Sequence, residues 1–347
     1  MSKTAFTALP IVDIAALVGG RGAAMQAAAD ALGRAAREVG FCYVTGHGIA
    51  EATFAGLLDA SRRFFALPME EKMKVYIGRS RNHRGYVPEG EEVFAAGSRD
   101  RKEAFDLAID LPADDPDVVA KNPLLGPNQW PALASFRSSV MAYYHAVFAA
   151  GRALMRGFAL ALGERADFFE PYLRKPPSQL RLIHYPFNPD AADAMGIGAH
   201  TDYECVTLLR STAPGLEVLN GEGRWIDVPL VAGALVINIG DMMEILTNGA
   251  FVATSHRVRP VRQERFSFPL FFSLDYHTRV APLPRFVTPE RPARAGLIAG
   301  EHLFAQTAQS FTYQKQRLAA GEIRLPEKHV SLSSFGQEAR YAGTTGP

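Results

Sequence analysis

The sequence predicts an α+β fold in which a largely helical N-terminal half surrounds a double-sheet β-core. The chain changes character near residue 179, from long stretches with apolar residues at helical spacing to short β-prone runs. Gly, Pro, Asn and Asp separate these runs, and short strands divided by turn residues are typical of sandwiches or barrels rather than alternating βαβ units. With 347 residues, the chain is long enough to bury a large core.

Three helices and one strand are predicted in the N-terminal half. Helices are favoured in three stretches: one is rich in Ala, one ends at Pro68, and one is long with apolar residues at helical spacing. The strand is aromatic and β-branched, and Gly46-His47-Gly48 ends it. The helices are expected over 22–38, 50–67 and 132–163, and the strand over 40–44.

Residues 78–102 contain glycines and mixed charges and are predicted to form a loop over a site. His83 and the Arg79–Arg84 cluster in this loop could meet an anionic substrate, although a solvated loop is the simpler expectation. Tyr86 is a candidate either for contact with an aromatic substrate or for the core.

Short strands dominate the second half, and a further helix is expected over 301–318. The predicted strands lie in 180–185, 206–209, 216–219, 234–239 and 265–274. We expect four regions: an N-terminal region with the loop over 1–125, a helical connector over 126–178, a β-core over 179–285, and a C-terminal helix and tail over 286–347.

Charge and cysteine content narrow the class of protein. Lys and Arg total 37 against 36 Asp and Glu, so nothing indicates a nucleic-acid binder. No apolar run is long enough to span a membrane, and the first residues lack the pattern of a secretory signal. Only two cysteines occur, which fits a reducing compartment. We therefore expect a cytoplasmic protein without nucleic-acid or membrane partners; its oligomeric state stays open.

A candidate metal site lies in the β-region. His200 and Asp202 are two residues apart, so in an extended chain both side chains point to the same face. His256 follows further along. Two histidines and one carboxylate leave one side of a metal open, which is the ligand set of non-haem Fe(II) oxygenases, although zinc also accepts such ligands.

A candidate anion site follows the proposed ligands. Arg265 and Ser267 share one face of a predicted strand, and a guanidinium with a hydroxyl donor is well matched to a carboxylate. Tyr185 can donate to the same carboxylate. A clamp of this kind beside an open metal suits a keto acid that binds the metal at its other end. A structural Arg–Asp pair is the alternative.

At these residues the chain resembles the isopenicillin N synthase-like family of Fe(II)/2-oxoglutarate dioxygenases. The resemblance spans most of the chain. It rests on 9–13, 40–49, 64–72, 84–88, 102–103, 181–186, 198–202, 240–241, 247–249, 255–258 and 265–267. It implies a distorted double-stranded β-helix, or jelly roll, with helices packed around it.

The resemblance also implies roles for individual residues. His200, Asp202 and His256 would bind iron, while Arg265 and Ser267 would hold the distal carboxylate of 2-oxoglutarate with help from Tyr185. Family members that do not use 2-oxoglutarate keep a similar Arg-x-Ser pair, so this motif indicates the iron site more directly than the cosubstrate. A narrower likeness, to bacterial ethylene-forming enzymes, would place Glu91, Arg181 and Tyr203 in the substrate pocket.

The expected activity is oxidation of a small organic molecule with Fe(II), 2-oxoglutarate and O₂. Hydroxylation, desaturation or cyclisation would accompany release of succinate and CO₂. Three alternatives stay open: an iron-dependent oxidase of the same fold that does not use 2-oxoglutarate, a catalytically idle relative that binds a small molecule, and a zinc hydrolase. The sequence does not identify the substrate.

Overall fold

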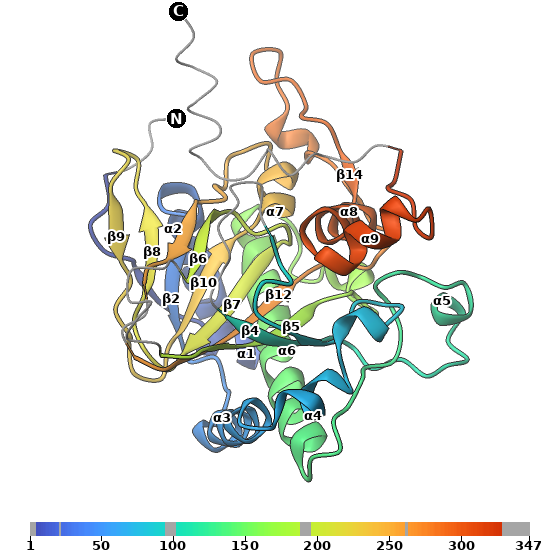
Figure 1. Cartoon of the computed structure of the whole chain (residues 1–347). Helices are drawn as coiled ribbons and strands as arrows, with labels where there is room; N and C mark the ends of the chain where they lie inside the picture. The colour runs from blue at the N-terminus through green and yellow to red at the C-terminus, as the bar shows by residue number, and fades with distance from the viewer. Residues whose placement is uncertain (1–4, 21, 94–101, 188–195, 261–262, 328–347) are drawn as a thin grey trace, which may run out of the picture.

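The computed structural model describes residues 5–20, 22–93, 102–187, 196–260 and 263–327. Its β-core consists of an eight-stranded and a four-stranded sheet, which form a distorted jelly roll (Figure 1). In spatial order, the large sheet contains β1 (Ile11–Asp13), β2 (Phe41–Thr45), β10 (Leu235–Ile239), β7 (Val206–Ser211), β12 (Arg265–Phe272), β5 (Gln179–Tyr185), β4 (Glu103–Leu107) and β3 (Gly85–Val87). The small sheet contains β6 (Ile197–His200), β11 (His256–Val258), β8 (Leu216–Leu219) and β9 (Trp225–Asp227). A separate hairpin pairs β13 (Arg279–Val280) with β14 (Leu297–Ile298).

The large sheet joins distant parts of the chain. Strands β1 to β4 come from the predicted N-terminal region, whereas β5, β7, β10 and β12 come from the predicted core region. Strand β2 pairs with β10, and β4 pairs with β5. The regions expected over 1–125 and 179–285 therefore share one sheet.

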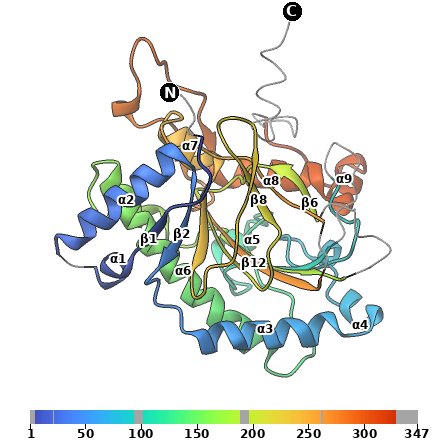
Figure 2. The ribbon, with the colours of Figure 1, turned by 90° about the vertical axis from the view of Figure 1, so that its left-hand side faces the viewer.

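Helices cover the outer face of the large sheet, with α6 (Phe136–Ala161) packed against β12 and β7. Helices α2 (Ala24–Glu38) and α3 (Glu51–Phe65) pack in turn against α6, and Figure 2 shows α3 along the lower side of the molecule. The buried residues of α6 include Val140, Val147, Leu154 and Phe158, which recur at helical spacing. Each such side chain contributes roughly 1.5–3 kcal/mol on burial.

Shorter helices complete the structure. Helices α8 (Ala299–Ser310) and α9 (Thr312–Ala319) lie on the opposite side of the molecule from β8 and β9 (Figure 1). The others are α1 (Ala15–Gly19), α4 (Met69–Met73), α5 (Pro116–Val119), α7 (Asp241–Leu246) and the short 3₁₀ helices η1 (Ile77–Arg79), η2 (Glu170–Tyr172) and η4 (Pro284–Phe286). Within the described ranges, no helix combines the length and apolar character needed to cross a membrane.

Most predicted elements are confirmed, and two expectations are wrong in part. The helix expected over 301–318 is interrupted at Phe311, whose extended backbone separates α8 from α9. The predicted solvated loop is wrong for its central part, because His83 and Arg84 are 0% and 1% exposed and β3 follows them. Burial of Arg84 is compensated by hydrogen bonds from its guanidinium to the carbonyls of His83 and Leu124, at 2.8 and 2.6 Å.

Candidate active site

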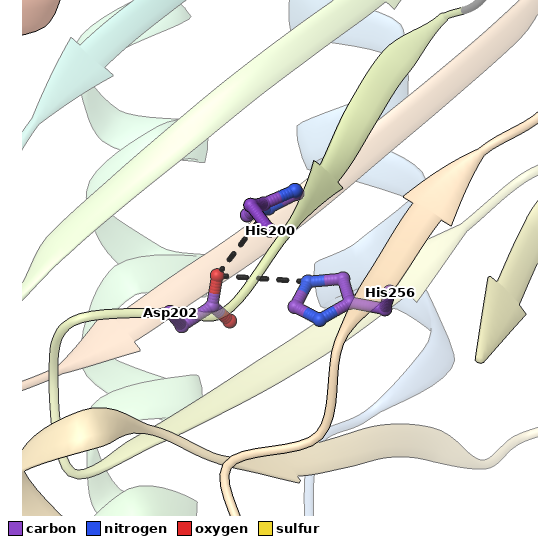
Figure 3. Close-up of side chains that lie close together, drawn as sticks. All are labelled: His200, Asp202 and His256. Carbon is purple, nitrogen blue, oxygen red and sulfur yellow. Dashed lines mark ion pairs between the residues drawn. The ribbon is translucent and has the colours of Figure 1, made fainter. Parts of the chain in front are cut away.

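The three predicted metal ligands converge on one point (Figure 3). His200 is the last residue of β6 and His256 the first of β11, and the antiparallel pairing of these strands places the two directly opposite each other. Asp202 lies just beyond β6. Its Oδ1 is 3.6 Å from the Nε2 atom of each histidine, and one donor atom from each residue lies within 4.8 Å of the others.

The histidine rings are oriented for metal binding. Nδ1 of His200 lies 2.8 Å from the Gly198 carbonyl, and Nδ1 of His256 lies 3.2 Å from the Thr254 carbonyl. A carbonyl can only accept, so each Nδ1 carries the proton and each Nε2 keeps its lone pair for a metal. Burial and the neighbouring His200 lower the pKa of His256 to about 4, which favours its neutral, ligating form near pH 7.

Asp202 is held from behind by two donors. The Thr207 hydroxyl and the Asn238 amide, the latter at 2.7 Å, both donate to Oδ2 and leave Oδ1 facing the histidines. Burial raises the pKa of Asp202. The nearby His256 and His200 and the two hydrogen bonds lower it by more, so the pKa of Asp202 is lowered overall. Donors about 2.1 Å from a shared ion can be up to about 4.2 Å apart, so both His–Asp separations of 3.6 Å fit one metal. This arrangement is the two-histidine, one-carboxylate set typical of non-haem iron.

The predicted anion clamp lies on β12 of the large sheet, whereas the two histidines lie on the small sheet. Arg265 is 1% exposed; its Nε donates to the Ala213 carbonyl at 3.1 Å and its Nη2 to Ser211 Oγ at 2.9 Å. Its Nη1 is buried and has no hydrogen-bond partner among the described residues. Ser267, two residues along, shares a hydrogen bond with Ser211 at 3.1 Å. A buried guanidinium with an unused donor fits an anionic ligand.

Tyr185 completes this side of the site. It pairs with Arg265 across strands β5 and β12, and the guanidinium lies 4.8 Å from the centre of its ring. Burial lowers the pKa of Arg265, whereas the nearby Tyr185 raises it. The guanidinium of Arg265 nevertheless stays charged at neutral pH. Arg265, Ser267 and Tyr185 are therefore together, as the sequence predicted.

One cavity of about 120 Å³ connects the two groups. Its wall contains the three metal-ligand candidates, Arg265, Ser267 and Tyr185, together with Arg181 and Tyr203. Arg181 makes a bidentate contact with Asp106, at 2.7 and 2.8 Å, and its Nη1 donates to Glu92 at 3.0 Å. Its charge is therefore balanced within the protein.

The structure does not bring Tyr86 and Glu91 to this cavity. The Tyr86 hydroxyl donates to Glu103 at 2.6 Å, and the ring is buried in the main core. Glu91 accepts from the Tyr76 hydroxyl at 2.8 Å and from the backbone of Tyr313 at 2.9 Å. Glu92 lies in the cavity wall instead, because consecutive side chains of an extended segment point to opposite faces.

Four ionisable residues in the described part of the cavity wall, Glu92, Lys102, His83 and Glu204, were missed or set aside on the sequence. Lys102 pairs with Glu92 at 3.0 Å, while His83 and Glu204 also line the wall. Burial, together with Asp202 and Asp241, raises the pKa of Glu204 to about 8. Its place two residues after Asp202 could have indicated the site. His83 gave no local signal, because its contacts come from the C-terminal helices.

Comparison with protein-family models identifies the family of the chain. A model described as the N-terminal region of non-haem dioxygenases in morphine synthesis matches residues 9–133, and the model of the 2OG-Fe(II) oxygenase superfamily matches residues 176–274. The chain belongs to the 2OG-Fe(II) oxygenase superfamily. The protein is thus a non-haem dioxygenase that uses Fe(II), 2-oxoglutarate and O₂ to oxidise a small organic molecule.

Individual relatives and solved structures agree with this family assignment. The chain is 36% identical to the 2-oxoglutarate-Fe(II) type oxidoreductase hxnY of Emericella nidulans, over 77% of this chain and 80% of that protein. It is 34% identical to a homoarginine-6-hydroxylase of Oryza sativa subsp. japonica, over 88% and 98%. A crystal structure of a 2OG-Fe(II) oxygenase family protein from Caulobacter crescentus matches with a TM-score of 0.75 at 31% identity, over 91% and 99%.

The fold is also that of a Neurospora crassa protein crystallised with alpha-KG and thymine. The TM-score is 0.74 at 24% identity, over 92% of this chain and 99% of that one. The family match and the relative described as a 2-oxoglutarate-Fe(II) type oxidoreductase, rather than this fold, set aside the three alternatives: an iron oxidase without 2-oxoglutarate, an idle relative and a zinc hydrolase.

Proposed function

We propose that His200, Asp202 and His256 bind the ferrous ion of this oxygenase. The convergence of their three donor atoms within 4.8 Å carries the proposal. The hydrogen bonds at each Nδ1 and at Asp202 Oδ2 orient these donors before the metal arrives. When bound, the ferrous ion supplies the coupled activation of O₂ and decarboxylation of 2-oxoglutarate to succinate and CO₂.

We propose that Arg265 and Ser267 hold the distal carboxylate of 2-oxoglutarate, with Tyr185 beside them. The unused Nη1 donor of Arg265 supports this role, since a carboxylate would satisfy it and balance the buried charge. Cavity walls that exclude water would strengthen this interaction and protect the reacting carbon from side reactions.

The substrate would occupy the part of the cavity between the metal ligands, Arg181 and Tyr203. The residues there would orient one C–H bond toward the metal, and hydroxylation is the simplest outcome. We further propose a cytoplasmic enzyme that needs no nucleic acid or membrane, in keeping with balanced charge and two buried free cysteines.

The test combines metal binding with product analysis. The purified oxygenase is loaded anaerobically with Fe(II) and 2-oxoglutarate and supplied with O₂ and a metabolite panel that includes L-homoarginine and thymine, since relatives act on or bind these compounds. We expect substrate-dependent succinate and a product that has gained one oxygen atom or lost two hydrogens. Loss of iron binding in His256→Ala, but not in the exposed control His145→Ala, is also expected. Normal iron binding in His256→Ala would contradict the ligand assignment.

A further inference from the structure

His83 lies in the cavity wall in an unusual and firmly held conformation. Its φ of 61° lies in the left-handed region, which side chains other than Gly adopt rarely, and such conformations persist where surrounding contacts enforce them. The Arg84 guanidinium donates to the His83 carbonyl at 2.8 Å, and Phe311, also in the cavity wall, packs edge-on against the imidazole at 4.5 Å. These contacts hold the imidazole ring of His83 in place in the cavity wall.

A chain of hydrogen bonds determines which nitrogen of His83 carries the proton. The Gln314 side-chain amide donates to the Tyr313 hydroxyl at 3.0 Å, and this hydroxyl lies 2.6 Å from His83 Nδ1. The hydroxyl has no other acceptor among the described residues, so its proton goes to Nδ1. In a neutral imidazole the second nitrogen, Nε2, must then carry the hydrogen.

The neutral form is favoured by the surroundings. Burial lowers the pKa of His83 well below its ordinary value, and the guanidinium groups of Arg181 and Arg84 lower it further. His83 thus presents one N–H donor from Nε2. That atom is buried, and it has no hydrogen-bond partner among the described residues. A buried donor without a partner is rare in folded proteins and indicates a missing acceptor.

The charges around the cavity indicate what kind of acceptor is missing. Arg181 is paired with Asp106 and Glu92, and Lys102 is paired with Glu92, so these cations are already balanced. Of the arginine and lysine side chains in the described cavity wall, only Arg265, which the proposed 2-oxoglutarate site uses, lacks a carboxylate partner. Arg84 lies outside that wall and donates to backbone carbonyls.

We propose that His83 binds the substrate directly, donating its Nε2–H to a neutral carbonyl-type oxygen such as that of an amide, lactam or ketone. The proposal rests on the proposed function for the location of the substrate. It makes His83 a specificity-determining residue, held in the required tautomer by Tyr313 and Gln314. Substrates that lack this oxygen would leave the buried donor unsatisfied and be selected against.

The tautomer of His83 is tested first, without any substrate or substrate analogue. Protein labelled with ¹⁵N-histidine and loaded with diamagnetic zinc and 2-oxoglutarate is examined by long-range ¹H–¹⁵N NMR, with His83 assigned from the missing signals of His83→Asn. We expect a neutral ring with the hydrogen on Nε2 at pH 7. A hydrogen on Nδ1, or a charged ring, would overturn the proposal.

Recognition is tested with a matched pair of probes, cyclohexanone and methylenecyclohexane, which differ only in C=O against C=CH₂. Wild-type protein should bind cyclohexanone at least tenfold more tightly. His83→Gln, whose amide can reach the Nε2 position, should keep this preference, whereas His83→Asn, which reaches only the Nδ1 position, should lose it. The exposed control His145→Asn should behave as wild type.

Equal affinity for both probes, absent cyclohexanone binding, or an unchanged preference in His83→Asn would refute the role of His83. Cyclohexanecarboxylate binding more tightly than cyclohexanone would refute the preference for a neutral acceptor. Failure of the proposed iron and 2-oxoglutarate sites is distinguished by direct titration of those two ligands, which does not depend on His83.

Discussion

At the residue scale, the hydrogen bonds behind each metal-ligand candidate orient its donor atom. Asn238 and Thr207 both donate to Asp202 Oδ2, so the second oxygen of the carboxylate remains for a metal. The Gly198 and Thr254 carbonyls perform the same task for the two histidines. These supporting groups come from β7, β10 and the backbone, and none of them is part of the His-x-Asp motif.

Asn238→Ala should weaken Fe(II) binding by about 10- to 100-fold, because Asp202 loses a donor that fixes its orientation. Anaerobic titration with Fe(II) measures the change. Asn122→Ala, which removes a loop hydrogen-bonding side chain outside the cavity wall, should leave the affinity unaltered. Equal iron affinity in the two variants would exclude this supporting role.

Arg265→Ala should raise the apparent KM for 2-oxoglutarate by about tenfold or more, since a charge-assisted hydrogen bond contributes about 1.5–3 kcal/mol. Initial rates of succinate formation measure this effect. Arg259→Ala is the matched control, because Arg259 is a more exposed arginine paired with Asp227 outside the cavity wall. An unchanged KM in Arg265→Ala would remove Arg265 from the clamp.

At the element scale, helix α6 supports the strand that carries the clamp. Strand β12 places Arg265 and Ser267 in the cavity wall, while Phe268 and Phe272 enter the main core. Gly151 of α6 allows the helix to approach closely, since a Cβ there would lie 2.3 Å from the Phe272 ring. The position of β12 thus depends on contacts distant from the metal.

Gly151→Val should destabilise the protein by about 1–3 kcal/mol or more, because the added side chain forces α6 away from Phe272. Urea unfolding measures the loss. Gly56→Ala in α3 is the control: the nearest atom to its Cβ is 3.9 Å away, so the helix should gain about 0.5–1 kcal/mol. Equal effects of the two substitutions would contradict the close packing at Gly151.

At the scale of the whole molecule, a buried ion network joins segments that are distant in the chain. Arg181 of β5 contacts Asp106 of β4 and Glu92, and Lys102 contacts Glu92 as well. Although burial opposes it, the charges of Arg181 and Lys102 lower the pKa of Glu92 to about 2. The folded state therefore keeps Glu92 ionised at pH values where the unfolded chain takes up a proton.

This difference predicts acid sensitivity with a defined sign. The stability contributed by Glu92 is present above pH 4.5 and is lost as the pH falls toward 2, with about 2 kcal/mol lost by pH 3. Glu92→Gln should be less stable than wild type at pH 7, since it leaves buried cations undercompensated. Between pH 6 and pH 3, the free energy of unfolding of Glu92→Gln should fall by about 2 kcal/mol less than that of wild type. Urea unfolding at both pH values measures this.

The exposed Glu222, which pairs with Arg224 on the surface, provides the control. Glu222→Gln should retain the pH dependence of wild type within about 0.5 kcal/mol. If Glu92→Gln also shows the pH dependence of wild type, the network does not hold Glu92 ionised.

The sequence by itself was enough to predict the three longest helices, most core strands and the pairing of functional groups within one segment. Alanine content and helical spacing located α2, α3 and α6, and the i, i+2 relation placed Arg265 beside Ser267 and His200 near Asp202. These features depend on backbone geometry over a few residues, so a short stretch of sequence specifies them.

Only the tertiary structure decided which distant side chains meet. It selected Glu92 over Glu91 for the cavity, buried His83 against Tyr313, and compensated Arg181 through Asp106. The register of β4 with β5 and the packing of the C-terminal helices set these contacts. Such contacts depend on how separate segments are aligned in space, and no local pattern of residues encodes that alignment.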